Sequence, residues 1–550
     1  MEAKKTEIEA MKAEIEATKV KMDAQKTDME AMKAEMEAIV EKIKATGASC
    51  DAMHADIKKT YDNIDIMAAQ KNPEKPRTEE ERADIDTVAD DPNAPLVTRL
   101  KAKAMKAQDA KDWPAAMDYW QAVVRETPSD AFAHFQLAYS AQSLADAEPE
   151  QSRSLHETAC RHYEQATDID PNEAIAHSNW GNALADLAEI ETNPEDKTRL
   201  FNEACAKYEQ ATAIDPNYAN AYSNWGSVLV NLAEVDADTE KKARLFNDAC
   251  AKYKQATDID PNYAPAFYNW GNALADLAKL ADDTEDKTRL LNDACRHYKQ
   301  ATDIDPNYAI AYYNWSVALQ ALAKVDADPK EKTRLLNEAC AKYKQARNLD
   351  PNDAIAFNGW GAALADLAEV AADPKEKTRL LNKAFSKFEQ ATDIDPNDAA
   401  TFNNWGNALG NLAEVDAKPE EKTRLFNEAC AKYEQATGID PNDADTYSNW
   451  GLTLMYFARI TDTPEKKTEL LSKAKEQCLK AEAIQKGMSA YNLACIAALQ
   501  GDPDQCHHWL TVCLDAGTMV SCDHLKTDED LDSVRNKPWF QELLKKVCAQ

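Results

Sequence analysis

The most regular feature of the chain is a pattern of apolar and polar positions that recurs every 45 residues. In one copy, Ala311, Trp315 and Leu319 are spaced at i, i+4 and i+8, which predicts an apolar stripe along a helix over 309–325. A fixed period of this size is typical of a stacked array, in which each unit buries its apolar face against its neighbours. The tryptophans and prolines that mark the period are Trp180, Trp225, Trp270, Trp315, Trp360, Trp405 and Trp450, with Pro171, Pro216, Pro261, Pro306, Pro351, Pro396 and Pro441.

The second half of the same unit predicts another helix, from Pro329 to about Asn348. Asp328 before Pro329 is a start signal, because an acid caps the helix and proline suits the first helical position. Pro351 cannot continue a helix, and Asp350 before it avoids the helical region, so the unit ends there. The apolar positions that share one face of this helix are Leu335, Ala339, Tyr343 and Ala346.

The N-terminal 70 residues have a different period. From Ile8 to Met67, apolar or small polar residues occupy two positions of every heptad, while Glu and Lys occupy the others. This pattern favours a coiled-coil helix over 1–70 that associates with another copy of the chain. A single charged helix without a partner is the alternative. Residues 71–95, with four prolines and many acids, predict a flexible linker.

The spacing of small and aromatic residues in the second helix resembles that of a known family. Ala339, Tyr343, Ala346 and Pro351 follow the order that closes a tetratricopeptide repeat (TPR), and so do Ala116, Trp120, Val123 and Pro128. The resemblance covers about Leu96 to Ala516. It implies an all-α fold: a right-handed α-α superhelical solenoid of TPR-like helical hairpins, here preceded by the coiled-coil helix. The usual unit has about 34 residues, so the repeats of this chain are extended.

On this basis the chain divides into six parts. A short TPR-like repeat over 96–130 follows the linker, and eight extended repeats occupy 131–486. A second short repeat is expected over 487–518, and capping helices over 519–550 cover the last apolar face, as a solenoid requires for solubility.

Charge limits the partners of such an array. The 550 residues include 64 Lys+Arg and 96 Asp+Glu, for a formal net charge of −32. Most of the surface therefore repels nucleic acid and anionic membranes, and we expect a protein or peptide partner, with basic segments favoured. We expect neither a signal peptide nor an integral membrane segment. Most of the thirteen cysteines lie at repeat-equivalent positions in apolar patterns, which favours reduced thiols and a cytoplasmic location.

The resemblance implies that the residues around each Trp face a groove that binds a protein segment. In the family, Asn before the Trp often bonds the backbone of a bound peptide. Inter-helix hydrogen bonding by the same amides is the alternative interpretation. The chaperone-tail clamp of the family needs Lys or Arg in this groove, which the sequence lacks. The expected groove residues are Asn179, Asn224, Asn269, Asn314, Asn404, Asn449, Tyr268, Tyr313, Asn182, Asn272, Asn407, Asp186, Asp276 and Asp366.

The added segment of each unit carries a second pattern, Lys-Thr-Arg-Leu after acids, as in Lys332–Leu335. A solvated rim of ion pairs is one interpretation, and a basic surface for an acidic partner is the other.

Catalytic and metal-binding motifs are not evident. The sequence has no Gly-rich phosphate loop, no HExxH and no nucleophile elbow, so we expect neither an enzyme nor a cofactor. Cys506, His507 and His508, with Cys513, Cys522 and His524, match no paired zinc-ligand spacing, so a metal is not expected.

The sequence therefore predicts a scaffold or adaptor that binds a protein segment in its groove and is oligomerised by the coiled coil. A structural spacer or self-assembling element is the alternative. The stretch Asn179–Leu184 also resembles a helix of plant mitochondrial import receptors, which use stretched repeats. Because this chain has many more units and no expected membrane anchor, a receptor role for targeting presequences is not expected.

Overall fold

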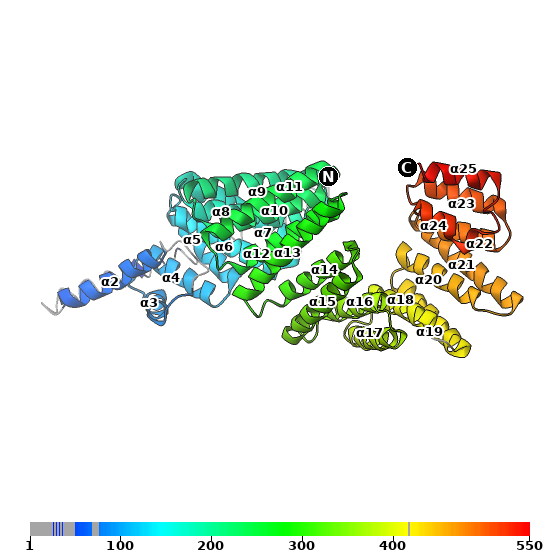
Figure 1. Cartoon of the computed structure of the whole chain (residues 1–550). Coiled ribbons are helices and arrows are strands. Elements are labelled where there is room, and N and C mark those ends of the chain that lie inside the picture. The colour runs from blue at the N-terminus through cyan, green and yellow to red at the C-terminus, as the bar shows by residue number, and fades with distance from the viewer. Residues whose placement is uncertain are drawn as a thin grey trace, which may run out of the picture. The chain divides into compact units, whose positions relative to one another are not determined.

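The fold is known from a computed structural model that describes residues 50–68, 76–415 and 418–549, together with the isolated positions 26, 29, 32, 33 and 36. Within these ranges every regular element is a helix (Figure 1). None of the described helices combines the length and the apolar character needed to cross a membrane.

Consecutive helices pair into hairpins. A short hairpin, α4 (Leu96–Asp109) with α5 (Trp113–Glu126), is followed by eight longer hairpins in the described chain. The longer hairpins are α6 (Ala131–Ala147) and α7 (Ser152–Ile169), α8 (Ala174–Glu189) and α9 (Pro194–Ile214), α10 (Ala219–Val235) and α11 (Thr239–Ile259), α12 (Ala264–Leu280) and α13 (Thr284–Ile304), α14 (Ala309–Val325) and α15 (Pro329–Leu349), α16 (Ala354–Val370) and α17 (Pro374–Ile394), α18 (Ala399–Val415) and α19 (Pro419–Ile439), and α20 (Ala444–Arg459) and α21 (Pro464–Ile484). A one-turn 3-10 helix, η2 (Pro149–Gln151), precedes α7.

The helix bounds predicted for the unit at 309–351 are confirmed. Helix α14 spans Ala309–Val325, and α15 spans Pro329–Leu349. Asp328 caps α15 by accepting from the backbone N–H of Lys330 at 3.1 Å. Most of the second helices have 21 residues, so part of the added length of each repeat lies in its second helix.

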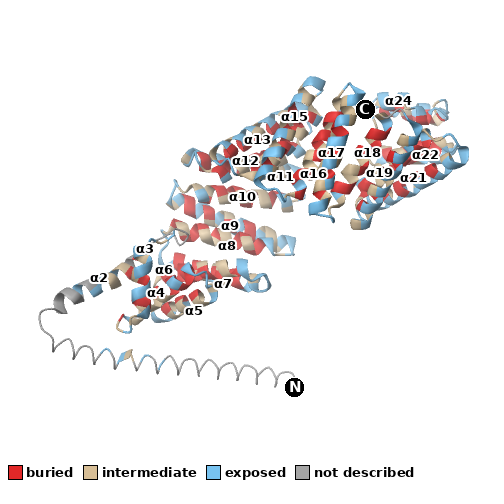
Figure 2. Cartoon of the chain, turned by 90° about the horizontal axis from the view of Figure 1, so that it is seen from below, coloured by how far each residue is buried: buried red, intermediate tan, exposed pale blue. Residues whose placement is uncertain are grey.

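The predicted apolar stripes form the core of each hairpin. Trp315 and Tyr343 are buried, as are the small residues beside them. Along the helices of both units, buried stretches alternate with exposed ones (Figure 2). In six of the seven hairpins from α8–α9 to α20–α21, close approach of the two helices depends on the glycine after the Trp, while α14 has Ser316 there. A Cβ at Gly181 would lie 2.8 Å from Cζ of Tyr208, which is inside van der Waals contact. The motif Trp-Gly is therefore a packing requirement of the hairpin.

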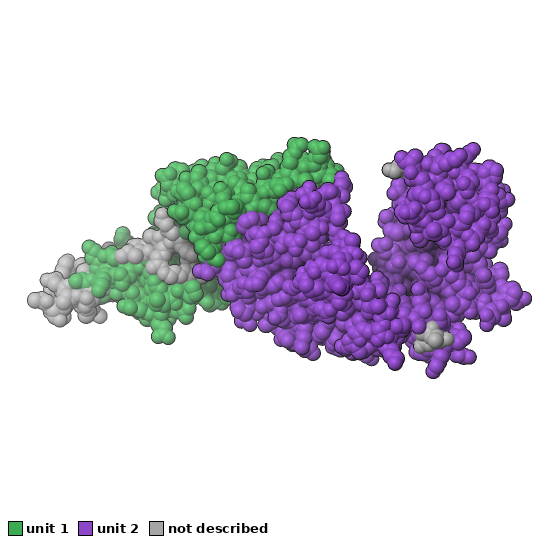
Figure 3. All heavy atoms as spheres, in the orientation of Figure 1, with its two compact units in different colours: residues 1–261 green, residues 262–550 purple. Residues whose placement is uncertain are grey.

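The chain forms two compact units, residues 1–261 and 262–550 (Figure 3). In unit 2, the first helices of successive hairpins contact one another: α14 contacts α16, α16 contacts α18, and α18 contacts α20. We call the face that these first helices line the inner face, and the face lined by the second helices the outer face.

The N-terminal region differs from the sequence prediction. Near the C-terminal end of helix α2 (Cys50–Ala68), Ile64 and Met67 are buried. They pack in one cluster with Ile85 and Val88 of α3 (Glu79–Asp90). The Oη of Tyr61 also donates to Asp91 at 2.5 Å. The expected linker over 71–95 thus contains a capped, packed helix, because its apolar residues find a core that the local pattern does not reveal. Ile64 and Met67 occupy the last two apolar positions of the predicted heptad pattern, and here they are buried by other residues of the same chain. The rest of the predicted coiled coil lies outside the described residues.

The C-terminal end closes the array. After the short hairpin α22 (Ala490–Leu499) and α23 (Pro503–Asp515) come α24 (Cys522–Thr527), η3 (Glu529–Leu531) and α25 (Pro538–Val547). A disulfide joins Cys522 to Cys548 and so ties the start of α24 to the end of α25. The pair departs from the reduced thiols expected for most of the cysteines, because two cysteines 26 residues apart in sequence meet only in the folded cap.

Candidate protein-binding groove

The predicted groove residues lie on the first helices. Each Asn before a Trp and each polar residue after it share one side of their own first helix, because positions separated by three or four residues lie on the same side of a helix. All fourteen predicted residues are partly buried. Most of them are already hydrogen-bonded within the protein.

The Asn before each Trp bonds the preceding repeat. The Nδ2 of Asn314 donates to Oδ1 of Asn272 at 2.9 Å and to Oη of Tyr268 at 3.0 Å. Asn224 donates to Asn182 at 3.0 Å. Both N–H groups of the Asn314 amide are therefore engaged inside the chain. The same arrangement recurs in Asn404, which donates to Asn358 at 3.0 Å, and in Asn449, which donates to Asn403 at 3.2 Å.

A second set of amides joins the two helices of a hairpin. The Oδ1 atoms of Asn182, Asn272 and Asn407 accept from the hydroxyls of Tyr208, Tyr298 and Tyr433, at 2.6, 2.8 and 2.7 Å. These tyrosines are buried, and an unpaired hydroxyl there would cost free energy. The structure therefore supports the alternative interpretation, inter-helix bonding, for most of the amide series.

The remaining predicted residues have varied surroundings. The ring centroids of Tyr268 and Tyr308 are 5.1 Å apart. Tyr313 packs edge-to-face on Tyr343, with the ring centroids 5.8 Å apart. Asn179 hydrogen-bonds the side chain of Tyr163. Asn269, in α12, is at the equivalent position of its repeat.

The predicted aspartates are partly withdrawn from water. Asp186 accepts from Nε2 of Gln142 at 2.8 Å, and Asp366 accepts from Gln320 at 3.0 Å. Burial raises the pKa of Asp186 to about 6 and also raises the pKa of Asp366. Asp276 instead forms an ion pair with Lys279 at 2.7 Å. Asp186 and Asp366 are therefore hydrogen-bonded by glutamines, whereas Asp276 has a lysine as its ion-pair partner.

Asp366 and three of the amides come together in unit 2. A groove of about 270 Å³ is bounded by α16, α18 and α20. Of the predicted residues, Asp366, Asn404, Asn407 and Asn449 line it. The other predicted residues in the same unit do not line it.

Two further carboxylates of this groove, Glu369 and Glu414, were missed from the sequence. Burial raises the pKa of both. Asn411 donates to Oε1 of Glu369 at 3.0 Å, which leaves the other carboxylate oxygen of Glu369 for a ligand. Glu369 lies three residues after Asp366, so helical spacing could have placed it on the same face.

The cysteines and histidines do not assemble the cluster considered from the sequence. Cys506 and Cys513 are buried core residues, and Cys522 is in the disulfide. The imidazole of His507 stacks on Trp539, with ring centroids 4.4 Å apart. The repeated cysteines are half-buried, and burial raises the pKa of Cys160, Cys295 and Cys340 to about 12, which disfavours reactive thiolate.

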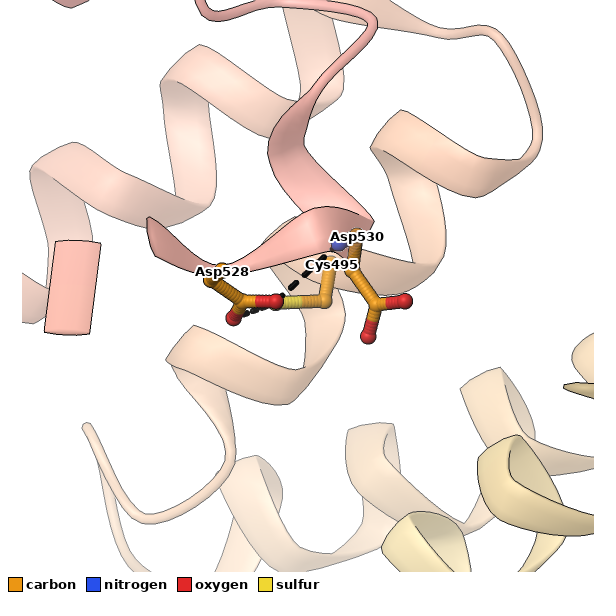
Figure 4. Close-up of side chains that lie close together, drawn as sticks. All are labelled: Cys495, Asp528 and Asp530. Carbon is orange, nitrogen blue, oxygen red and sulfur yellow. Dashed lines mark hydrogen bonds between the residues drawn. The ribbon is translucent and has the colours of Figure 1, made fainter. Parts of the chain in front are cut away.

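One set of possible metal ligands does meet in the described residues: Cys495, Asp528 and Asp530 (Figure 4). Their side chains already have partners. Asp528 accepts from Tyr491 at 2.7 Å and from the Cys495 thiol at 3.6 Å, and Asp530 is ion-paired with Arg459. The cluster holds the C-terminal cap on α20 and α22, and these contacts explain it without a metal.

Comparisons with known proteins bear on this arrangement. A family model described as the plant-specific mitochondrial import receptor subunit TOM20 matches residues 215–325 and 393–504. The comparison with curated proteins finds no match.

Several solved structures are similar in part. YrrB, titled a TPR protein with an unusual peptide-binding site, is 20% identical, with a TM-score of 0.28, and the match covers 42% of this chain and 96% of that one. The C-terminal part of a TPR repeat-containing protein from Cytophaga hutchinsonii is 14% identical with a TM-score of 0.37, covering 55% and 97%. MamA is 18% identical with a TM-score of 0.27, covering 40% and 93%.

The expected cytoplasmic location is wrong. The matching family model is that of a mitochondrial import receptor subunit, which points to the mitochondrion rather than the cytoplasm. The prediction of an all-α solenoid of TPR-like hairpins, in contrast, is confirmed by paired consecutive helices with the 45-residue spacing and by the family match, while the coiled-coil part stays a prediction. The described chain is a solenoid of extended, TPR-like helical hairpins, and over residues 215–325 and 393–504 it is similar to the plant import-receptor family.

Proposed function

We propose that the protein is an interaction scaffold that binds a basic protein segment on the inner face of unit 2. The observation that carries this proposal is the groove bounded by α16, α18 and α20, which brings Asp366, Glu369 and Glu414 together. A fold of stacked helical hairpins presents an extended surface for protein partners. The acidic lining selects among those partners, because opposite charge raises both the rate of encounter and the discrimination against acidic segments.

The amides have a supporting role in this proposal. Asn404, Asn407 and Asn449 are tied to neighbouring helices, so they hold the groove in shape and offer the segment only their unused polar atoms. The carboxylates of Glu369 and Glu414 provide the charge. A receptor role, such as the name of the matching family describes, fits a surface that accepts basic segments.

Binding by the full chain tests the proposal. A fluorescein-labelled octalysine peptide is titrated by fluorescence anisotropy against the wild-type chain and against Glu369→Gln with Glu414→Gln. We expect the double variant to bind about tenfold more weakly, because two attractive contacts are lost. Glu389→Gln with Glu434→Gln is the matched control, since these exposed glutamates lie on the outer helices α17 and α19. Equal weakening by both pairs would refute the groove as the binding site.

Oligomerisation through the N-terminal segment stays a proposal. Because Ile64 and Met67 are part of the core near α3, the truncation that tests it removes residues 1–49 and keeps α2. Analytical ultracentrifugation of the full and truncated chains then measures the effect. An unchanged monomer would remove the basis for oligomerisation and for the alternative function of a self-assembling spacer.

A further inference from the structure

The outer face of unit 2 has hollows between successive second helices. One hollow, of about 590 Å³, has α15 and α17 as its walls and residues of α16, including Trp360, as its floor. Both α15 and α17 pack on α16, while the first helices also pack on one another. The second helices are therefore held apart at the outer face. A similar hollow, of about 530 Å³, lies one repeat later between α17 and α19.

The two hollows differ in charge. Four basic residues and one acid line the α15–α17 hollow, and two of each line the α17–α19 hollow. The charged residues are Lys344, Arg379, Lys383, Lys387 and Glu376 in the first, and Arg424, Lys432, Glu421 and Glu428 in the second. The first hollow is thus strongly positive in a chain whose formal net charge is −32.

The difference comes from a local departure from the repeat. In α15, Arg334 forms an ion pair with Glu338, four residues later, at 2.9 Å. In α17 the equivalent positions are Arg379 and Lys383, so the acid is replaced by a second cation. Acids occupy the place of Lys383 in five of the other second helices, as Glu203, Asp248, Asp293, Glu338 and Glu428.

The cations of this hollow are incompletely neutralised. Arg379 is paired with Glu376 three residues earlier. Lys387 lies over the ring of Trp360, with its Nζ 4.5 Å from the centroid. Lys344 and Lys383 are exposed, and neither forms an ion pair with the residues described. Two unpaired ammonium groups and an aromatic floor therefore face the same space of about 590 Å³.

We propose that the α15–α17 hollow binds an acidic segment of a protein partner. The hollow has the volume of sites that enclose several side chains, and it is open between two parallel-running walls, which suits an extended segment. Its ammonium groups would pair with carboxylates, and Trp360 would contact the apolar parts of the segment. The rest of the acidic surface repels such a segment and confines it to this hollow. This site is separate from the inner-face groove.

A titration of the full chain with fluorescein-labelled octaglutamate tests the proposal. We expect Lys383→Glu, which introduces an acid as in five of the other second helices, to weaken binding about tenfold, because an attractive contact becomes a repulsive one. Since the same acid is native at this position in neighbouring helices, the variant should fold, and circular dichroism verifies that it does. Lys254→Glu is the matched control: it has the same charge change on α11, where Lys254 pairs with Asp258.

The neighbouring hollow provides a gain-of-binding test. Glu428→Lys places a cation at the same position in the α17–α19 hollow, and we expect it to add a second octaglutamate site. Binding should weaken as salt rises, because exposed charges are screened.

Three results would overturn the proposal. One is equal affinity of Lys383→Glu and Lys254→Glu for octaglutamate. Another is equal binding of octalysine and octaglutamate by the Glu369→Gln, Glu414→Gln variant, in which the inner-face groove is weakened. The third is self-association of the wild-type chain that Lys383→Glu abolishes, since the acidic segment would then belong to a second copy.

Discussion

The same substitution, glycine to alanine, should have opposite effects at two positions of equivalent helices. Gly361 follows Trp360 in α16, and a Cβ built there would lie 2.5 Å from Cε1 and 2.7 Å from Cδ1 of Phe388. The Phe388 ring is completely buried and cannot move away without disturbing its neighbours. Gly410 lies in α18, and its nearest contacts would be Thr453 Oγ1 at 3.6 Å and Cγ2 at 3.8 Å, which are ordinary van der Waals distances.

The magnitudes follow from two opposing terms. Alanine is favoured over glycine by about 1 kcal/mol in a helix interior. Overpacking a tight core costs about 1–3 kcal/mol. At Gly410 only the first term applies, so Gly410→Ala should stabilise its helix by about 1 kcal/mol. At Gly361 the second term offsets or exceeds the first, so the change in stability should be about 0–2 kcal/mol of destabilisation. The two variants should therefore differ by about 1–3 kcal/mol.

Hydrogen–deuterium exchange of the full chain measures this difference locally. Repeat arrays do not always unfold in one step, so a single midpoint would mix the repeats, whereas exchange reports the opening of each helix. Protection should rise in α18 for Gly410→Ala and stay equal or fall in α16 and α17 for Gly361→Ala. Equal increases in both variants would refute the conclusion that the Trp-Gly motif is kept by contact with the ring of the second helix.

Three further predictions concern other parts of the chain. Ser316 stands where the other extended first helices from α8 to α20 have glycine, and Gly359 compensates for it one repeat later. A Cβ at Gly359 would meet Tyr343 at 2.7 Å. Gly359→Asn should therefore destabilise α15–α16 by about 1–3 kcal/mol. Adding Ser316→Gly should recover part of that loss in hydrogen exchange, and strictly additive losses would contradict the coupling. Because burial raises the pKa of Asp186 to about 6, its contribution to stability is present below about pH 4 and is lost as the pH rises through 6. Asp186→Asn should therefore raise the free energy of opening of α8, measured by hydrogen exchange, by about 1 kcal/mol at pH 7 and leave it unchanged at pH 3. This value is reduced for solvent screening, because the Asp186 side chain is 39% exposed. An equal gain at both pH values would show that ionisation of Asp186 is not the cause. Reduction of the disulfide between Cys522 and Cys548, which are 26 residues apart, should weaken the attachment of α24 and α25 by about 3 kcal/mol and leave α14–α19 unaffected in exchange experiments. Unchanged exchange in α25 would show that packing alone holds the cap.

Part of the candidate site could be predicted from the sequence. The positions around each Trp do lie on the first helices, and Asp366, Asn404, Asn407 and Asn449 line the inner-face groove. Their individual roles could not be predicted. Asn314 donates to residues 42 and 46 positions earlier, so its bonds depend on the stacking of one repeat on another. No local pattern distinguishes an amide bonded within the protein from one available to a partner.

The interpretation of the outer rim shows the same limit. The sequence left two possibilities for the Lys-Thr-Arg-Leu segments, a rim of ion pairs and a basic surface. Arg199, Arg334 and Arg424 form ion pairs within their own helices, which supports the first. At Arg379 the partner four residues later is Lys383, and the spacing of α15 and α17 turns that one difference into a positive hollow. The consequence of a single residue therefore depended on the packing of its helix.

The sequence by itself determined the helices of the repeats, their bounds in the unit at 309–351 and their pairing into hairpins, but not helix α3 in the predicted linker. These follow from capping residues, prolines and the 45-residue period, all of which act within one repeat. The tertiary structure alone decided which polar groups are hydrogen-bonded inside the array. It also decided that Ile64 and Met67 pack on α3 and that Cys522 meets Cys548. Each of these outcomes depends on groups that are distant in sequence, and their meeting is fixed by the stacking of helices.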